Sequence, residues 1–159
     1  ASSLRIPNDE RAIEFVKNNI DMLCKSSPVY EHGDFHMGNL IYTTNKKVGV
    51  IDFNRWECGD RFEEFYKIQS FDVEHSIPFS VGEIQGYFDG EPPIDFWKIQ
   101  AVYVAHGSLY SIKWAEKFGQ EDVDGMTKRC LKAFEDYDNF NLIIPKWYLQ
   151  NKDKYRTEV

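Results

Sequence analysis

The stretch HGDFHMGN at residues 32–39, followed by VIDF at residues 50–53, decides how this chain is interpreted. It contains a carboxylate at Asp34, a carboxamide at Asn39 and a second carboxylate at Asp52. A carboxylate in a loop can accept a proton as a general base, and magnesium binds to carboxylate and amide oxygens. The pattern therefore predicts a site in which Asp34 accepts a proton while Asn39 and Asp52 bind a metal ion. Each residue alone is an ordinary turn former, and the prediction depends on their fixed order.

The segments around these loops predict a β-hairpin. Residues 40–43 and 48–51 are short apolar runs, and the polar residues 44–47 between them form a turn. Residues 29–31 are expected to be extended. The hairpin would thus lie between the two loops that carry the chemistry.

The rest of the chain has the spacing of apolar residues that is typical of helices. The expected helices cover residues 9–25, with Asn8 and Asp9 as the cap, and residues 61–71, 80–88, 94–118 and 121–138. Gly107 and Ser108 interrupt the longest one and predict a kink or a close packing contact there. The tail beyond Tyr148, which includes Arg156 and Glu158, is expected to fray. The expected fold class is α+β and mainly helical, with residues 1–159 as a single domain.

Composition excludes several classes of function. The 19 basic residues are outnumbered by 26 acidic ones, giving a net charge of −7, which disfavours binding to nucleic acid. Three cysteines are too few for a disulfide framework, so a reducing cytoplasm is the expected compartment. No apolar run is long enough to span a membrane. The acidity would suit a small cationic substrate.

The strings HGDFHMGNLI and VGVIDF, followed by Gly59-Asp60, resemble the aminoglycoside phosphotransferase family and its small-molecule kinase relatives. The resemblance implies a carboxy-terminal lobe like that of the protein kinases, with Asp34 as the catalytic residue and with Asn39 and Asp52 as ligands of Mg2+. It also implies ATP or GTP as the phosphoryl donor. The acceptor would be a hydroxyl group of a small molecule, such as an aminoglycoside or another cationic metabolite, and antibiotic resistance is one role that the resemblance suggests.

Two departures from the family pattern come after the second loop. Members usually have Gly-Asp-Pro and then Asp-Leu-Ala, whereas this chain has Arg61 after Asp60 and Glu64-Phe65-Tyr66 further on. Asp60 is expected to anchor the following helix by accepting hydrogen bonds from free amides. His32 is expected to brace the loop through a hydrogen bond to the backbone near Asp52.

The resemblance also implies an amino-terminal lobe with a glycine-rich loop and a lysine that hold the nucleotide. No such segment precedes Asp34 in the sequence. The chain is therefore expected to be the carboxy-terminal lobe without its nucleotide lobe, and to be inactive by itself.

Substrate choice in such kinases depends on the helical region after the second loop. An acidic, aromatic-edged pocket for an amine is expected there, with Glu63, Glu64, Asp72 and Glu116 as its candidate residues.

Two alternative functions remain open from the sequence. The chain could be a non-catalytic module that binds a ligand or a partner. It could also be a metal-dependent hydrolase built on His32, Asp34, His36 and Asp52.

Overall fold

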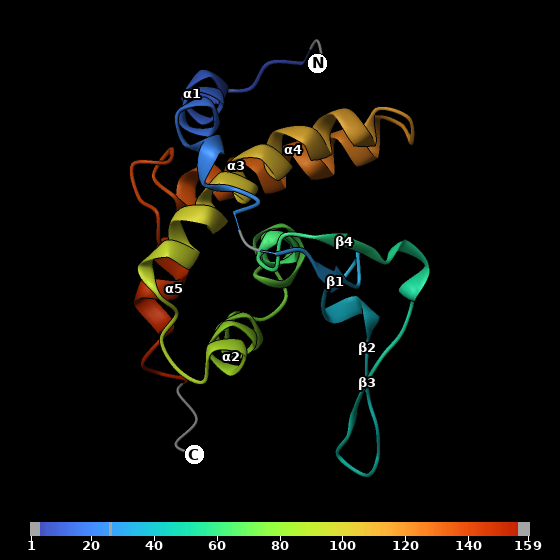
Figure 1. The fold of residues 1–159 in the computed structure, drawn as a ribbon. Helices are drawn as coiled ribbons and strands as arrows, with labels where there is room; N and C mark the ends of the chain where they lie inside the picture. The colour runs from blue at the N-terminus through green and yellow to red at the C-terminus, as the bar shows by residue number, and fades with distance from the viewer. Residues whose placement is uncertain (1–3, 26, 156–159) are drawn as a thin grey trace.

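Helices and strands occupy different sides of the molecule (Figure 1), which a computed structural model describes for residues 4–25 and 27–155. The helices are α1 (Asp9–Asn19), α2 (Ile77–Phe88), α3 (Ile94–Ala115), α4 (Gln120–Asp136) and α5 (Lys146–Asn151). The strands are β1 (Val29–Glu31), β2 (Leu40–Tyr42), β3 (Val48–Val50) and β4 (Glu57–Gly59). This mainly helical arrangement is compatible with the α+β class.

The strands form two separate antiparallel pairs. In the first, β2 pairs with β3, Leu40 lying opposite Val50, and this confirms the predicted hairpin. In the second, β1 pairs with β4 so that Val29 lies opposite Gly59. Strand β4 was not predicted, because three residues without an apolar pattern do not distinguish a strand from a loop.

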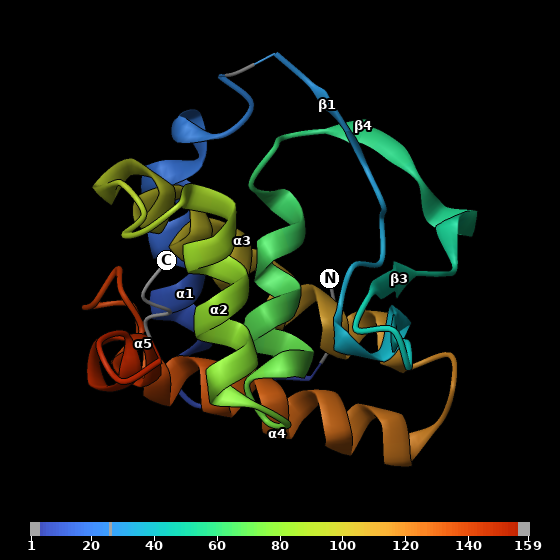
Figure 2. The ribbon, with the colours of Figure 1, turned by 90° about the horizontal axis from the view of Figure 1, so that it is seen from below.

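The core lies between α1, α3 and α4, with a second cluster of buried residues around α2 and α5. In the view from below, α4 runs beneath α2, and β1 and β4 arch away from the helices (Figure 2). Helix α3 is buried along most of its length. Such burial removes apolar side chains from water and is the main stabilising term in the fold.

Two helix predictions need correction. Helix α1 ends at Asn19 and is followed by a 3-10 turn to Met22, and the Asn8 side chain makes no capping hydrogen bond because its backbone is left-handed (φ 65°). Residues 61–71 do not form one α-helix. They comprise a 3-10 turn, Glu63–Phe65, and a π-helical segment, Ile68–Asp72. Within residues 61–72, Glu64, Lys67 and Asp72 are hydrogen-bonded to the loop of residues 32–39, and apolar spacing along the sequence does not reveal such long-range contacts.

The predicted close contact at Gly107 is confirmed. A Cβ atom at this position of α3 would lie 2.8 Å from the ring of Tyr66. Glycine therefore lets the segment that carries Tyr66 pack directly against the backbone of α3.

The chain beyond Tyr148 is more ordered than predicted. Helix α5 continues to Asn151, and the indole of Trp147 donates a 2.7 Å hydrogen bond to Gln69. Gln69 in turn donates to Asp136 at 2.9 Å, so a buried polar chain joins three elements. Arg156 and Glu158 lie outside the described residues. Within the described ranges no helix has the length and apolarity needed to cross a membrane.

Candidate active site

The loop of residues 32–39 depends on Gly33 for its shape. Gly33 has a φ of +79°, and a Cβ atom there would lie 1.8 Å from the carbonyl oxygen of Arg55. Only glycine accommodates both the left-handed backbone and this close approach. The loop of residues 32–39 and the 3-10 turn Phe53–Arg55 therefore lie in direct contact.

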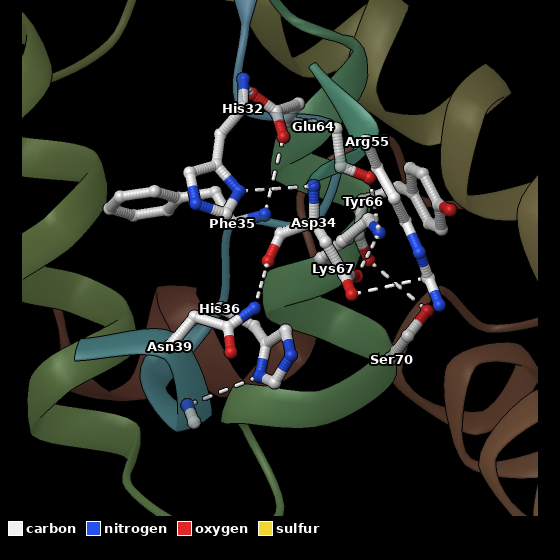
Figure 3. A network of polar contacts seen from close by, with 12 residues as sticks. His32, Asp34, Phe35, His36, Asn39, Arg55, Glu64, Tyr66, Lys67 and Ser70 are labelled. Atoms are coloured by element: carbon white, nitrogen blue, oxygen red, sulfur yellow. Dashed lines mark hydrogen bonds and ion pairs between the residues drawn. The ribbon is translucent and has the colours of Figure 1, made fainter. Parts of the chain in front are cut away.

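The carboxylate of Asp34 lies between two cations (Figure 3). Lys67 Nζ is 2.6 Å from Oδ1, and Arg55 Nη1 is 3.1 Å from Oδ2. Lys67 Nζ also donates to the carbonyl oxygen of Gly33 at 3.1 Å. The Lys67 side chain is only 9% exposed, whereas that of Arg55 is 59% exposed. The lysine is thus a fixed partner, and the arginine is free to reach other anions.

These cations keep Asp34 ionised. Partial burial opposes the charge, but the hydrogen bond and charge of Lys67, assisted by Arg55, outweigh it and lower the pKa of Asp34. The carboxylate is consequently ready to accept a hydrogen bond from a hydroxyl group.

The backbone brings Asn39 and Asp52 to the same end of the hairpin. Asn39 Nδ2 donates to the carbonyl oxygen of Asp34 at 2.9 Å, and the amide of Ile51 donates to the carbonyl oxygen of Asn39 at 3.0 Å. Asp52 comes directly after Ile51 in a left-handed conformation, with a φ of 66°. The loops of Asp34, Asn39 and Asp52 therefore converge.

The donor set at this point fits a magnesium ion. The side-chain nitrogen of Asn39 donates to the carbonyl oxygen of Asp34, so the side-chain oxygen Oδ1 of Asn39 points away from that carbonyl. Among residues 4–25 and 27–155, none makes a hydrogen bond or ion pair with Asn39 Oδ1 or with the Asp52 carboxylate. Magnesium typically takes one or two protein oxygens and keeps water or phosphate oxygens for the rest.

Hydrogen bonds of His32 and Glu64 fix the position of the loop of residues 32–39. His32 Nε2 lies 2.8 Å from the carbonyl oxygen of Ile51. The two carboxylate oxygens of Glu64 accept the amides of His32 at 2.8 Å and Phe35 at 3.2 Å. Glu64 therefore positions the loop, with both of its oxygens engaged.

The remaining predicted residues lie at different places. Asp60 is buried and accepts the amides of Cys24 (2.9 Å) and Phe62 (3.1 Å), which links the chain after α1 to the segment after β4. Asp72 is buried and accepts the amide of Met37 at 2.8 Å. Glu116 is exposed after α3 and pairs with Lys113. The structure does not gather these acids into one pocket.

Glu63 is half-buried close to other acids. Burial, followed by the charges of Glu57 and Asp60, raises its pKa. Its carboxylate therefore carries a proton more readily than an exposed one.

The His/Asp cluster of the hydrolase alternative is not assembled. His32 is bonded to Ile51, and His36 Nδ1 accepts the amide of Gly38 while its ring lies 5.4 Å from that of Phe71. In the described part of the chain no three His, Cys, Asp or Glu side chains are placed to share a metal ion. The structure gives this alternative no support.

Sequence reasoning missed Lys67 and Arg55. Lys67 is 33 residues from Asp34 and stands in a segment that was interpreted only as an amphipathic helix. In the sequence, the feature that distinguishes Lys67 is its position between two apolar residues, Tyr66 and Ile68. In the structure Lys67 is buried. Arg55 comes three residues after Asp52, and no pattern in the sequence distinguishes it from an ordinary surface arginine.

An ionised carboxylate at Asp34, two nearby side chains with oxygens that have no partner among the described residues, and an exposed arginine form an arrangement that a group-transferring enzyme could use. The model of the phosphotransferase enzyme family matches residues 4–97. This is more than half of the chain, and the chain belongs to that family. No curated protein and no solved structure matches it.

Proposed function

We propose that the chain is the catalytic and substrate-binding lobe of an ATP- or GTP-dependent kinase that phosphorylates a hydroxyl group of a small molecule. Membership of the phosphotransferase family supports phosphoryl transfer as the class of reaction. The observation that carries the assignment is the position of Asp34, which is ionised, partly buried and next to the converging Asn39 and Asp52 loops.

In this proposal Asp34 orients the acceptor hydroxyl and takes its proton as the bond to phosphorus forms. Lys67 keeps the carboxylate ionised and fixed. Arg55 is more exposed, so it can leave Asp34 Oδ2 and pair with the triphosphate, which frees that oxygen for the acceptor.

Asn39 Oδ1 and the Asp52 carboxylate would hold the magnesium ion. When bound, the ion would neutralise part of the charge on the triphosphate. The chain contributes two oxygen donors fixed by the hairpin, because the Ile51–Asn39 hydrogen bond sets the spacing of the two loops.

The nucleotide would need a second lobe, and the strands offer a surface for it. Large apolar side chains on and beside them are exposed, including Tyr30 (81%), Tyr42 (71%), Val48 (61%) and Trp56 (62%). A second lobe packed on the strands would remove these apolar side chains from water. We propose that an amino-terminal lobe covers this face and that the 159-residue chain alone has negligible kinase activity.

The test is transfer of label from γ-32P-labelled ATP or GTP to a panel of aminoglycosides, choline and sugars. The chain alone is compared with a longer product of the same reading frame. Transfer that requires the longer product and falls by about 10²- to 10⁴-fold in the Asp34→Asn variant is expected. Equal transfer by Asp34→Asn would contradict the assignment, and robust transfer by the chain alone would contradict the need for a second lobe. A non-catalytic binding module would show no transfer with either product.

A further inference from the structure

An acidic pocket lies on the other side of the loop of residues 32–39 from the Asp34 carboxylate. Its volume is about 510 Å³, and its walls are residues of β1, of the segment 61–65 and of α2. Phe35 lines it, and Figure 3 shows the Phe35 ring and the Asp34 carboxylate pointing to opposite sides of the loop. The pocket is therefore separate from the site proposed for phosphoryl transfer, and a ligand could bind in it whether or not that reaction takes place.

Two carboxylate oxygens in this pocket are buried and have no hydrogen-bond partner. Glu31 is 8% exposed, and its Oε1 is unpaired, as is Oε2 of Glu83. A buried ionised oxygen without a partner is costly, so each of these oxygens calls for a donor that the described residues do not provide.

The surroundings of both residues are acidic. Burial and then the charges of Glu63, Glu64, Glu57 and Asp60 raise the pKa of Glu31 to about 7. Burial, followed by the charges of two further acids, raises the pKa of Glu83 to about 8. The cationic side chain on the pocket wall is Arg61, which is exposed and lies over the ring of Phe62 at 5.8 Å.

The walls favour an organic cation over a metal ion. Four aromatic rings line the pocket, those of Tyr30, Phe35, Phe65 and Tyr87. The described residues include no group of three His, Cys, Asp or Glu side chains that could share a metal ion, and rings on the walls are surfaces that suit an organic cation. A ligand with several ammonium groups on an aliphatic chain could contact the rings and pair with the carboxylates of Glu31 and Glu83.

We propose that this pocket binds a short polyamine, one ammonium group pairing with Glu31 and another with Glu83 while the aliphatic part packs against the rings. Glu64 also lines the pocket, and it is the residue that holds the amides of His32 and Phe35. A bound polyamine would thus lie next to Glu64, the residue that holds the loop of residues 32–39.

The test is calorimetric titration of the 159-residue chain with spermidine at pH 8 and 0.15 M salt. Saturable binding is expected, weaker by roughly tenfold or more in each of Glu31→Gln and Glu83→Gln, because each loses one charge-assisted hydrogen bond. Glu121→Gln removes an exposed acid on α4 and is the matched control, which should bind as the unchanged chain does.

Further variants and a competitor separate the proposal from general attraction to an acidic protein. Tyr87→Ala keeps every charge and removes a ring that is 50% exposed, so it should fold and bind more weakly. The same molar concentration of MgCl2 should not displace spermidine. Absence of saturable binding, equal binding by the Glu31→Gln/Glu83→Gln double variant, or displacement by equimolar magnesium would each overturn the proposal.

Discussion

At the residue scale, the pairing of Asp34 with Lys67 bears on stability as well as on the proposed role of Asp34 as a base. The Lys67 ammonium is nearly buried and has Asp34 and the Gly33 carbonyl as its partners. Removing the carboxylate leaves a buried cation without a counter-charge. Asp34 is therefore expected to matter for folding as well as for chemistry, which the sequence did not suggest.

The first prediction concerns this pair. Asp34→Asn should lower the free energy of unfolding by about 1–3 kcal/mol, and adding Lys67→Met should restore part of the loss. Urea unfolding at pH 7 measures both. Asp95→Asn breaks the exposed pair with Lys98 and should cost less than about 0.5 kcal/mol. A double variant less stable than Asp34→Asn would argue against the buried-cation explanation.

The second prediction concerns Glu64. Glu64→Gln keeps the shape of the side chain but replaces one acceptor oxygen by a donor, so one of the amides of His32 and Phe35 loses its partner. Hydrogen exchange at that amide should become faster. The amide of Met37, which donates to Asp72, is the internal control and should keep its protection. Unchanged exchange at both loop amides would show that Glu64 does not hold the loop.

At the element scale, local patterns predict what local forces decide. The hairpin of β2 and β3 and the helices α2, α3 and α4 are predictable from apolar spacing and from turn residues. Strand β4 and helix α5 depend on partners far along the chain, so the sequence alone does not indicate them. The same holds in the site: the order of Asp34, Asn39 and Asp52 is local, whereas the contact with Lys67 exists only in the folded chain.

Helix α5 provides the third prediction. Trp147→Phe keeps most of the buried ring but removes the indole donor, leaving Gln69 Oε1 without a hydrogen bond. The expected loss of stability is about 1–3 kcal/mol. Thermal or urea unfolding measures it, with Trp56→Phe as the control, because Trp56 is 62% exposed. Equal effects of the two variants would mean that the polar chain through Gln69 does not stabilise α5.

At the scale of the whole molecule, the acids with raised pKa values set the pH dependence of stability. Glu31 and Glu83 bind protons more tightly in the folded chain than in the unfolded chain. Their contribution to stability is therefore present below the ordinary value of about 4.5 and is lost as the pH rises toward 7 and 8. Asp34 has the opposite sign, since its lowered pKa favours folding above 3.8 and loses that effect in stronger acid.

The fourth prediction rests on these signs. Unfolding free energy should fall between pH 5 and about 8, and the Glu31→Gln/Glu83→Gln double variant should show a flatter profile and greater stability at pH 8. Glu121→Gln should leave the profile unchanged. If the double variant is less stable at pH 8 than the unchanged chain, Glu31 and Glu83 must have hydrogen-bond donors other than the described residues, and the prediction is wrong.

In the proposed kinase, the exposed strand face and the loops of Asp34, Asn39 and Asp52 have separate roles. Exposed rings beside β1 and β4 suit a second lobe, while the Asn39 and Asp52 loops meet at the end of the hairpin. The central claim is that these two loops hold one divalent ion next to Asp34.

Nuclear magnetic resonance with Mn2+, a paramagnetic substitute for Mg2+, tests this claim most directly. Sub-stoichiometric Mn2+ should broaden the amide signals of Asn39 and Asp52 before those of α4. Asp52→Asn should abolish the effect at Asn39, whereas Glu121→Gln should not. Broadening at Asn39 that persists unchanged in Asp52→Asn would contradict the account.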